Sequence, residues 1–232
     1  GLFKQKIENG YQIELPDQWM QTGFNWEVRK PKHRVPVKFF GKIVYNEATG
    51  KYEHVDAEEV YAVPYDVPII GNGTTTTNTL RLWEAEASDN IPANQNFRQY
   101  IQNVRDICQM LYPDDSTPAG KMLRLKQEYF FTCAGLNSIV KAHLRVYPNM
   151  NNFHEKNVIQ LNDTHPVLAI PELMRILIDE KGYEWDEAWD ITTQTFAYTN
   201  HTILAEALET WPIDLMQSLL PRIYQIIEEI HR

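Results

Sequence analysis

An aspartate and two histidines follow apolar segments in the second half of the chain. Asp163 and His165 come directly after one short apolar run, and His201 comes after another. Carboxylates accept hydrogen bonds from sugar hydroxyls, and imidazoles both donate and accept them, so these three side chains suit a carbohydrate site. An aspartate with two histidines can also hold zinc or manganese, which leaves a metal site open.

Two further interpretations apply to the same residues. A carboxylate pair could serve a glycosidase, which needs one protonated acid and one ionised partner. Alternatively, Asp163 and Thr164 could cap the helix that follows, with the histidines bonded to the backbone. The Asp-x-His spacing is a weak signal, so residue types alone do not choose among these possibilities.

Residues 113–120 carry a strong loop signal together with two adjacent carboxylates, Asp114 and Asp115. A mobile loop with acidic groups could cover a polar site, and the ring of the preceding Tyr112 could stack on a sugar face. The competing interpretation is a solvated turn.

The segment around Asp163 predicts a strand that leads into a helix. The apolar run at residues 158–161 is typical of a buried strand, and apolar residues at helical spacing begin after Pro166. In open α/β sheets, ligands bind where strands end and helices begin. Asp163 and His165 are therefore expected to lie at such an edge.

The rest of the chain predicts an α/β protein with a β-rich N-terminal part and a helical C-terminal part. Residues 1–45 alternate apolar and polar positions between turn signals, residues 43–55 resemble a hairpin, and residues 59–63 are expected to form another strand. Gly71 and Gly73 predict a turn rather than a phosphate loop, because no helix or lysine follows them in the required pattern. Long helices are expected over residues 97–112 and 122–146, and a later one is expected to be capped by Asp186.

Composition excludes several classes of protein. The chain has 232 residues, a net charge of −9 and 43% hydrophobic residues, which suits a packed domain and argues against a protein that coats nucleic acid or an anionic membrane. No apolar stretch approaches the length of a membrane span. The two cysteines, Cys108 and Cys133, show no paired spacing, so a reducing, cytoplasmic setting is expected.

Both ends of the sequence predict a piece of a longer protein. The chain begins at Gly1 without an initiator methionine and enters strand-like sequence at once. It stops at Arg232, inside an amphipathic helical pattern with no capping residue after it.

Five sequence blocks occur in order: LRLKQEYF at residues 123–130, QLNDTHP at 160–166, AIPELMR at 169–175, AYTNHT at 197–202, and EALE at 206–209 before Trp211 and Pro212. Together they resemble the α-glucan phosphorylases, the family of glycogen, starch and maltodextrin phosphorylases. The resemblance runs essentially end to end, from residues 5–7 through 78–83 to 220–222.

The resemblance implies a fold and a reaction. The fold would be the Rossmann-like, glucan-side N-terminal half of a GT-B glycosyltransferase, with residues 1–232 covering most of that domain and the cofactor-binding C-terminal domain absent. The reaction would be phosphorolysis, in which inorganic phosphate releases glucose 1-phosphate from the non-reducing end of an α-1,4-glucan. The family uses pyridoxal phosphate, whose phosphate group assists proton transfer.

The resemblance also implies roles for single residues. His201 would contact the glucosyl unit at the reaction subsite, and Asp163 and His165 would contact the sugar on the acceptor side. Tyr112 would lie near the acceptor sugars, and Asp115 would belong to a loop that covers the site. The parent protein is expected to be a cytoplasmic homodimer.

Several departures from the family limit these expectations. Ser116 stands where the family loop often has an asparagine, and Lys141 and Ala142 replace the paired arginines of AMP-activated animal enzymes. No segment matches the cofactor lysine or the phosphate-binding half, so this chain alone is expected to be inactive. The alternative function is a non-catalytic glucan-binding or assembly module.

Overall fold

The computed structural model describes residues 2–17, 23–91, 96–110, 112–205 and 208–232. The strands are β1 (Leu2–Glu8), β2 (Tyr11–Asp17), β3 (Val28–Arg29), β4 (Val35–Phe39), β5 (Lys42–Asn46), β6 (Lys51–Val55), β7 (Glu58–Ile70), β8 (Thr77–Ala87), β9 (Ile159–Asn162) and β10 (Phe196–Thr199). The α-helices are α1 (Phe97–Gln109), α2 (Pro118–His143), α3 (Phe153–Lys156), α4 (Ala169–Arg175), α5 (Trp185–Thr195), α6 (Ile213–Leu219) and α7 (Pro221–His231). Two 3-10 turns, η1 (Pro31–His33) and η2 (His165–Leu168), and a π-turn, η3 (Ile176–Glu180), complete the described elements.

The N-terminal part is β-rich, as the alternating pattern predicts. Strand β7 pairs antiparallel with β3, β4 and β8, whereas β1–β2 and β5–β6 form separate hairpins. The inward residues of β4 are all buried, because alternate side chains of a strand point to one face of its sheet. Gly71 and Gly73 lie in the turn between β7 and β8, which confirms the expected turn.

Helix α2 lies at the centre of the molecule. It begins at Pro118, whose missing N–H costs nothing at the first helical position, and the Thr117 hydroxyl accepts a hydrogen bond from the Gly120 N–H at 3.1 Å. One part of the helix packs on the β4–β7 sheet through Leu125 and Phe130. Because Leu136 and Val140 pack instead against the other helices, α2 joins the two hydrophobic clusters of the core.

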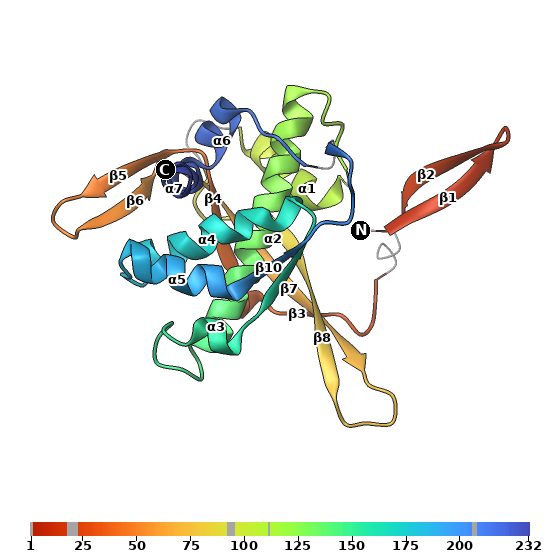
Figure 1. The fold of residues 1–232 in the computed structure, drawn as a ribbon. Helices are drawn as coiled ribbons and strands as arrows, with labels where there is room; N and C mark the ends of the chain where they lie inside the picture. Colours follow the sequence, from red (N-terminus) through yellow and green to blue (C-terminus); the bar gives the residue numbers. More distant parts are fainter. Residues whose placement is uncertain (1, 18–22, 92–95, 111, 206–207) are drawn as a thin grey trace.

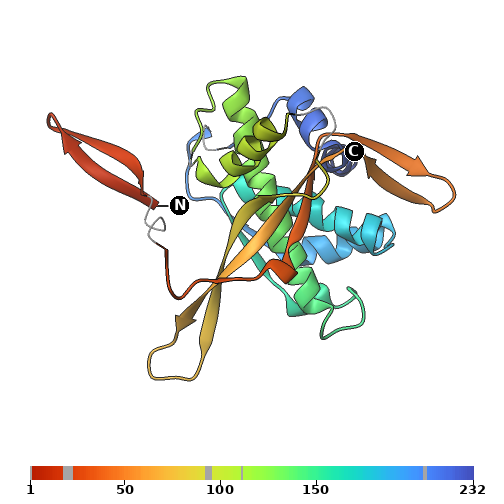
Figure 2. The same cartoon turned by 180° about the vertical axis from the view of Figure 1, so that it is seen from behind.

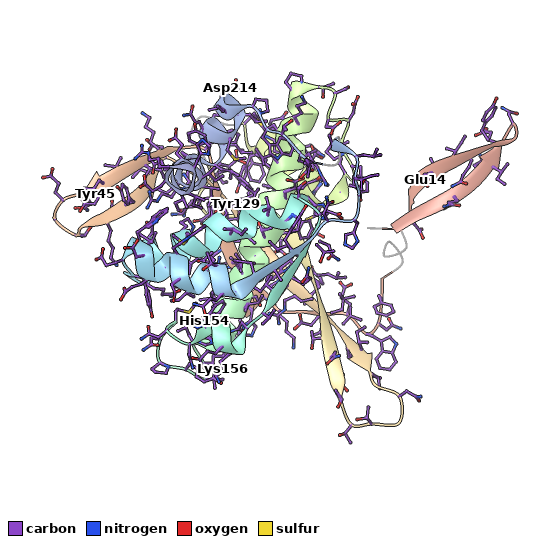
Figure 3. The ribbon with its side chains drawn as sticks, viewed as in Figure 1. Glu14, Tyr45, Tyr129, His154, Lys156 and Asp214 are labelled. Atoms are coloured by element: carbon purple, nitrogen blue, oxygen red, sulfur yellow. The ribbon has the colours of Figure 1, made fainter. Side chains whose placement is uncertain are left out.

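The projecting hairpins contrast with this interior. Figure 1 shows β1–β2, β5–β6 and the far end of β7–β8 extending away from the helical body, and the view from behind in Figure 2 agrees. In Figure 3, Tyr129 lies within the body, whereas Glu14 and Tyr45 lie on hairpins. The β1–β2 and β5–β6 hairpins and the far end of β7–β8 therefore contribute little to the packing that holds α2 in place, whereas the near end of β7–β8 shares a core cluster with α2.

Strands β9 and β10 form a two-stranded parallel sheet, and the prediction of a strand leading into helical structure is confirmed. The predicted burial of that strand is wrong, because only Leu161 of β9 is buried. Strand β10 is the one described strand that pairs with β9. Helices pack on a single face of β9. The short apolar run of Val158, Ile159 and Leu161 predicts a strand covered on both faces, which is not the arrangement described.

Candidate functional site

The carboxyl ends of β9 and β10 bring two candidate segments to the same edge. The strands run parallel with Asn162 opposite Thr199, so the residues after each strand leave the sheet side by side (Figure 1). The Asp163 N–H donates a hydrogen bond to the Thr199 carbonyl at 3.2 Å, which extends the pairing by one step. Asp163 and His201 thus lie in the two chain segments that leave this edge.

Asp163 lies in a left-handed backbone conformation, with φ of +65°. Only a few per cent of non-glycine residues adopt this region, with aspartate and asparagine several-fold enriched, and such outliers gather at functional sites. Thr164 stands at the N-cap of η2, but its side chain makes no capping bond to the helix backbone. The expectation that Thr164 caps this helix is therefore wrong, and the turn has another support.

That support is a reciprocal pair of hydrogen bonds to Glu209. The Thr164 hydroxyl donates to Glu209 Oε2 at 3.3 Å, and the Glu209 N–H donates to Thr164 Oγ1 at 3.3 Å. Glu209 lies beyond β10, in the same connection as His201. The two connections that leave the sheet edge are therefore fastened to each other by side chain and backbone.

The candidate ligand-contacting groups are accessible at this edge. His165 and His201 are exposed, Asp163 is half-buried and Tyr112 is 61% exposed. Tyr112 also has a positive φ, of +50°, which is unusual for a bulky aromatic residue. The tyrosine ring and the polar side chains can all contact a ligand that approaches from solvent.

The two carboxylates of the 113–120 loop differ in their surroundings. Asp114 Oδ1 accepts hydrogen bonds from the Ser116 N–H at 3.0 Å and the Ser116 hydroxyl at 2.6 Å, and these bonds lower the pKa of Asp114. A Cβ on Gly120 would lie 1.8 Å from the Asp114 carbonyl oxygen, so the loop closes tightly on the start of α2. Both carboxylates are exposed, but Asp114 is bonded within the turn through Ser116.

Arg124 connects the loop to the sheet edge, and sequence reasoning missed it. Its guanidinium lies 5.3 Å from the centre of the Tyr112 ring, within the range of a cation–π contact. Its Nε lies 3.0 Å from Glu128 Oε1, and its Nη2 lies 3.8 Å from Glu209 Oε1. The i,i+4 spacing of Arg124 and Glu128 on a helix was the available signal.

A cavity of about 330 Å³ lies beside these groups. Arg124, Glu128 and His165 line it, together with the apolar side chains of Ile107, Met110, Phe131 and Pro166. Burial raises the pKa of Glu128 to about 9, with the neighbouring Glu209 adding to the effect and Arg124 opposing it. The cavity therefore combines an apolar wall with one cation and one protonated acid.

Comparison with known proteins decides the family. The carbohydrate phosphorylase family model matches residues 1–232, the whole chain. The chain belongs to the carbohydrate phosphorylase family. The resemblance carried by the five sequence blocks is thus confirmed.

Curated members of the family align with the whole chain. It is 51% identical to glycogen phosphorylase of Bacillus subtilis (strain 168) over 233 aligned residues and 45% identical to the muscle form of Ovis aries over 247. In both comparisons, all of this chain matches 29% of the relative. The chain therefore spans under a third of the length of these phosphorylases.

The described lysines do not fit the cofactor implied by the family. Pyridoxal phosphate forms a Schiff base with a lysine. Lys126 is the one buried lysine among the described residues, and its Nζ lies 3.0 Å from Glu58 Oε1, within cation–π range of Phe39 and Phe40. This ion pair gives Lys126 a scaffolding position, so no step of the chemistry is assigned to it.

Neither a metal cluster nor a membrane span is found in the described part of this phosphorylase-family chain. No three His, Cys, Asp or Glu side chains among those residues are grouped to hold a metal ion, so the zinc interpretation has no structural support. None of the described helices has the length and apolar character needed to cross a bilayer.

Proposed function

We propose that the chain is the glucan-side part of an α-glucan phosphorylase, within the Rossmann-like N-terminal half of a GT-B fold. The family match and the coverage of about 29% of each relative support a longer parent. The observation that carries the proposal is the β9–β10 edge, where the turn after one strand is bonded to the segment after the other. Such an edge is where α/β folds bind ligands.

In the parent, inorganic phosphate would cleave an α-1,4-glucan at its non-reducing end to give glucose 1-phosphate. Within this chain, His201 would contact the glucosyl unit, and Asp163 and His165 would bind hydroxyls of the next sugar. Tyr112 offers an exposed ring for a sugar face, and Asp115 lies on the covering loop. These groups bind and orient glucan.

The remaining parts of the reaction would come from the rest of the parent. Pyridoxal phosphate supplies a phosphate group for proton transfer when bound, and the lysine that holds it would lie outside this chain. The parent is proposed to be a cytoplasmic homodimer. The cationic groups for phosphate would also lie mainly outside this acidic chain, whose net charge is −9.

The proposal is tested first in the longer polypeptide that carries residues 1–232. We expect the purified protein, with pyridoxal phosphate, to release glucose 1-phosphate from maltoheptaose and phosphate. His201→Ala should lower kcat/KM about 100-fold, as expected when a group that orients the substrate is lost. The matched control is His231→Ala, an exposed histidine at the end of α7, which should retain wild-type activity.

The 232-residue chain gives the second test. Calorimetric titration with maltoheptaose should show binding that Asp163→Asn weakens, and no glucose 1-phosphate should form. Asparagine is chosen because it tolerates the left-handed backbone at this position. Glucan binding by the longer protein without any phosphorolysis would instead identify a non-catalytic glucan-binding module.

A further inference from the structure

Arg124 reaches both the Tyr112 ring and the segment after β10. Its guanidinium carbon lies 5.3 Å from the centre of the Tyr112 ring, and its Nη2 lies 3.8 Å from Glu209 Oε1. Its own helix, α2, contributes to both hydrophobic clusters, so the guanidinium is attached to the element that joins the two parts of the core. Arg124 is therefore placed to fix the spacing between the tyrosine and the sheet edge.

Glu209 passes this restraint to the Asp163 turn. Its Oε2 accepts a hydrogen bond from the Thr164 hydroxyl while its N–H donates one back. Its other oxygen faces Arg124. A change in the position of the Glu209 carboxylate would thus move the turn that carries Asp163.

Glu128 is the third member of the cluster and has little access to solvent, with a side chain only 3% exposed. Arg124 on the same helix lies 3.0 Å from Glu128 and also faces Glu209 at 3.8 Å, Glu128 Oε1 has no hydrogen-bond partner among the described residues, and His165 of η2 and Cys108 of α1 line the same cavity. Glu128 and Glu209 share the Arg124 guanidinium, and because Glu128 is buried beside a second carboxyl group, its charged form is disfavoured. A proton on Glu128 allows its O–H to donate to the Glu209 carboxylate.

We propose that Arg124 is a positioning residue for the glucan site and that Glu128 must carry a proton for Arg124 and Glu209 to hold the Tyr112 ring and the Asp163 turn together. When Glu128 releases its proton to solvent, it repels Glu209 and competes with it for Arg124. Glu209 then withdraws from Thr164, and the turn loses this one restraint while the bond from the Asp163 N–H to the Thr199 carbonyl remains. Glucan affinity therefore falls as pH rises through the titration of Glu128; this last step rests on the proposed function.

The direct test follows Glu128 in the 232-residue chain without ligand. Carbon-13 NMR of the Glu128 carboxyl and of the Thr164 methyl group is recorded from pH 6 to pH 10. We expect the carboxyl to titrate near pH 9, as its burial indicates, and the Thr164 signal to shift with the same midpoint. A Glu128 carboxyl that titrates near its ordinary value of 4.5, or a Thr164 signal that does not follow it, would overturn the proposal.

Calorimetric titration with maltoheptaose over the same pH range adds the functional readout. The wild-type Kd should rise about tenfold between pH 7 and pH 10, the size of one lost charge-assisted contact. Glu128→Gln keeps an N–H donor toward Glu209 and cannot ionise, so its Kd should not change as the wild-type Kd rises. The matched control is Glu84→Gln, which removes another carboxyl whose pKa is raised by burial, in β8, and should leave the wild-type rise in place.

The outcomes separate this inference from the proposed function. If wild-type chain binds no maltoheptaose at any pH while the Thr164 signal still follows Glu128, the positioning cluster stands and the glucan-site assignment fails. If glucan binds and Glu128→Gln shows the same pH-dependent loss as wild type, the assignment stands and the role of Glu128 is refuted. Measurement of the wild-type NMR signals decides the case even if the glutamine variant does not fold.

Discussion

Two arginine–carboxylate clusters involve successive residues of helix α2, Tyr129 in the first and Glu128 in the second, yet their hydrogen-bonding surroundings differ. In the first, the buried carboxylate of Glu172 accepts hydrogen bonds from Arg175 Nε and Nη2, both at 2.8 Å, and from the Tyr129 hydroxyl, also at 2.8 Å. The Asn137 amide adds a fourth donor at 3.4 Å. This cluster is rich in donors and lies within the core.

The second cluster is poor in donors and lies beside the candidate site. Glu128 lies 3.0 Å from Arg124, which it shares with a second carboxyl, Glu209, and its Oε1 has no hydrogen-bond partner among the described residues. At Arg175, burial lowers the pKa, but the interactions with Glu172 outweigh the effect of burial and the pKa rises. At Glu128, burial and the neighbouring Glu209 both raise the pKa. The same types of side chain thus make a fixed ion pair in one place and a titrating acid in the other.

Removing the acid of the first cluster should give the largest effect on stability. Glu172→Ala leaves the Arg175 guanidinium without its main partner in the interior, and breaking a buried pair in this way costs about 3–5 kcal/mol. Urea unfolding followed by circular dichroism measures the change. A loss below about 1 kcal/mol would mean that this cluster is as loosely held as a surface pair.

The second cluster should instead make the stability of the folded chain depend on pH. The folded chain keeps a proton on Glu128 up to about pH 9, whereas the unfolded chain releases it near pH 4.5. The stabilisation of the folded chain that comes from this proton is therefore complete below pH 4.5 and is lost by about pH 9. Within that window the free energy of unfolding should fall by up to about 1.4 kcal/mol per pH unit from this group. Glu128→Gln should remove that slope, which thermal unfolding at pH 5, 7 and 9 would show.

A smaller effect is expected from one donor of the first cluster. Tyr129→Phe keeps the ring and removes the hydroxyl that donates to Glu172, at a cost of about 1–2 kcal/mol. Urea unfolding at pH 7 measures it, and the pH dependence should match that of the wild type. A change in that dependence would show that the two clusters are coupled through α2.

The smallest effect should come from the link between the second cluster and the turn. Thr164→Val removes both reciprocal hydrogen bonds to Glu209 at a partly exposed position, which should cost about 0.5–1 kcal/mol. Maltoheptaose affinity should fall more clearly than stability does. Equal affinity for wild type and variant would show that the turn does not depend on Glu209.

The sequence predicted the elements better than their boundaries and contacts. Helix α2 was expected from residue 122 but begins at Pro118, because prolines count as loop signals although the first helical position favours them. The helix that was expected to be capped by Asp186 is capped by Glu184, whose side chain forms a capping box with Glu187. Both errors concern residues that serve equally well in a loop and at a helix start.

The sequence allows the residues of the candidate site to be proposed, but not the contacts that support them. Asp163, His165 and His201 stand at the ends of apolar runs, which the sequence displays directly. The positive φ angles of Tyr112 and Asp163 and the meeting of Arg124 with Glu209 depend on how distant segments pack. The i,i+4 spacing marks Arg124 and Glu128 as a pair, but no local pattern shows that Arg124 also meets Glu209 and Tyr112.

The parallel pairing of β9 with β10 also sets when the site can form during folding. Helices α1 and α2 depend mostly on local contacts, and such contacts close early. The hydrogen bond between Asp163 and Thr199 can form only after the intervening elements η2, α4, η3 and α5 have been synthesised and have packed so that β10 lies beside β9. During synthesis from the N-terminus, the central helix would therefore be available for packing well before the ligand-facing edge exists, and the site would be among the last features to appear.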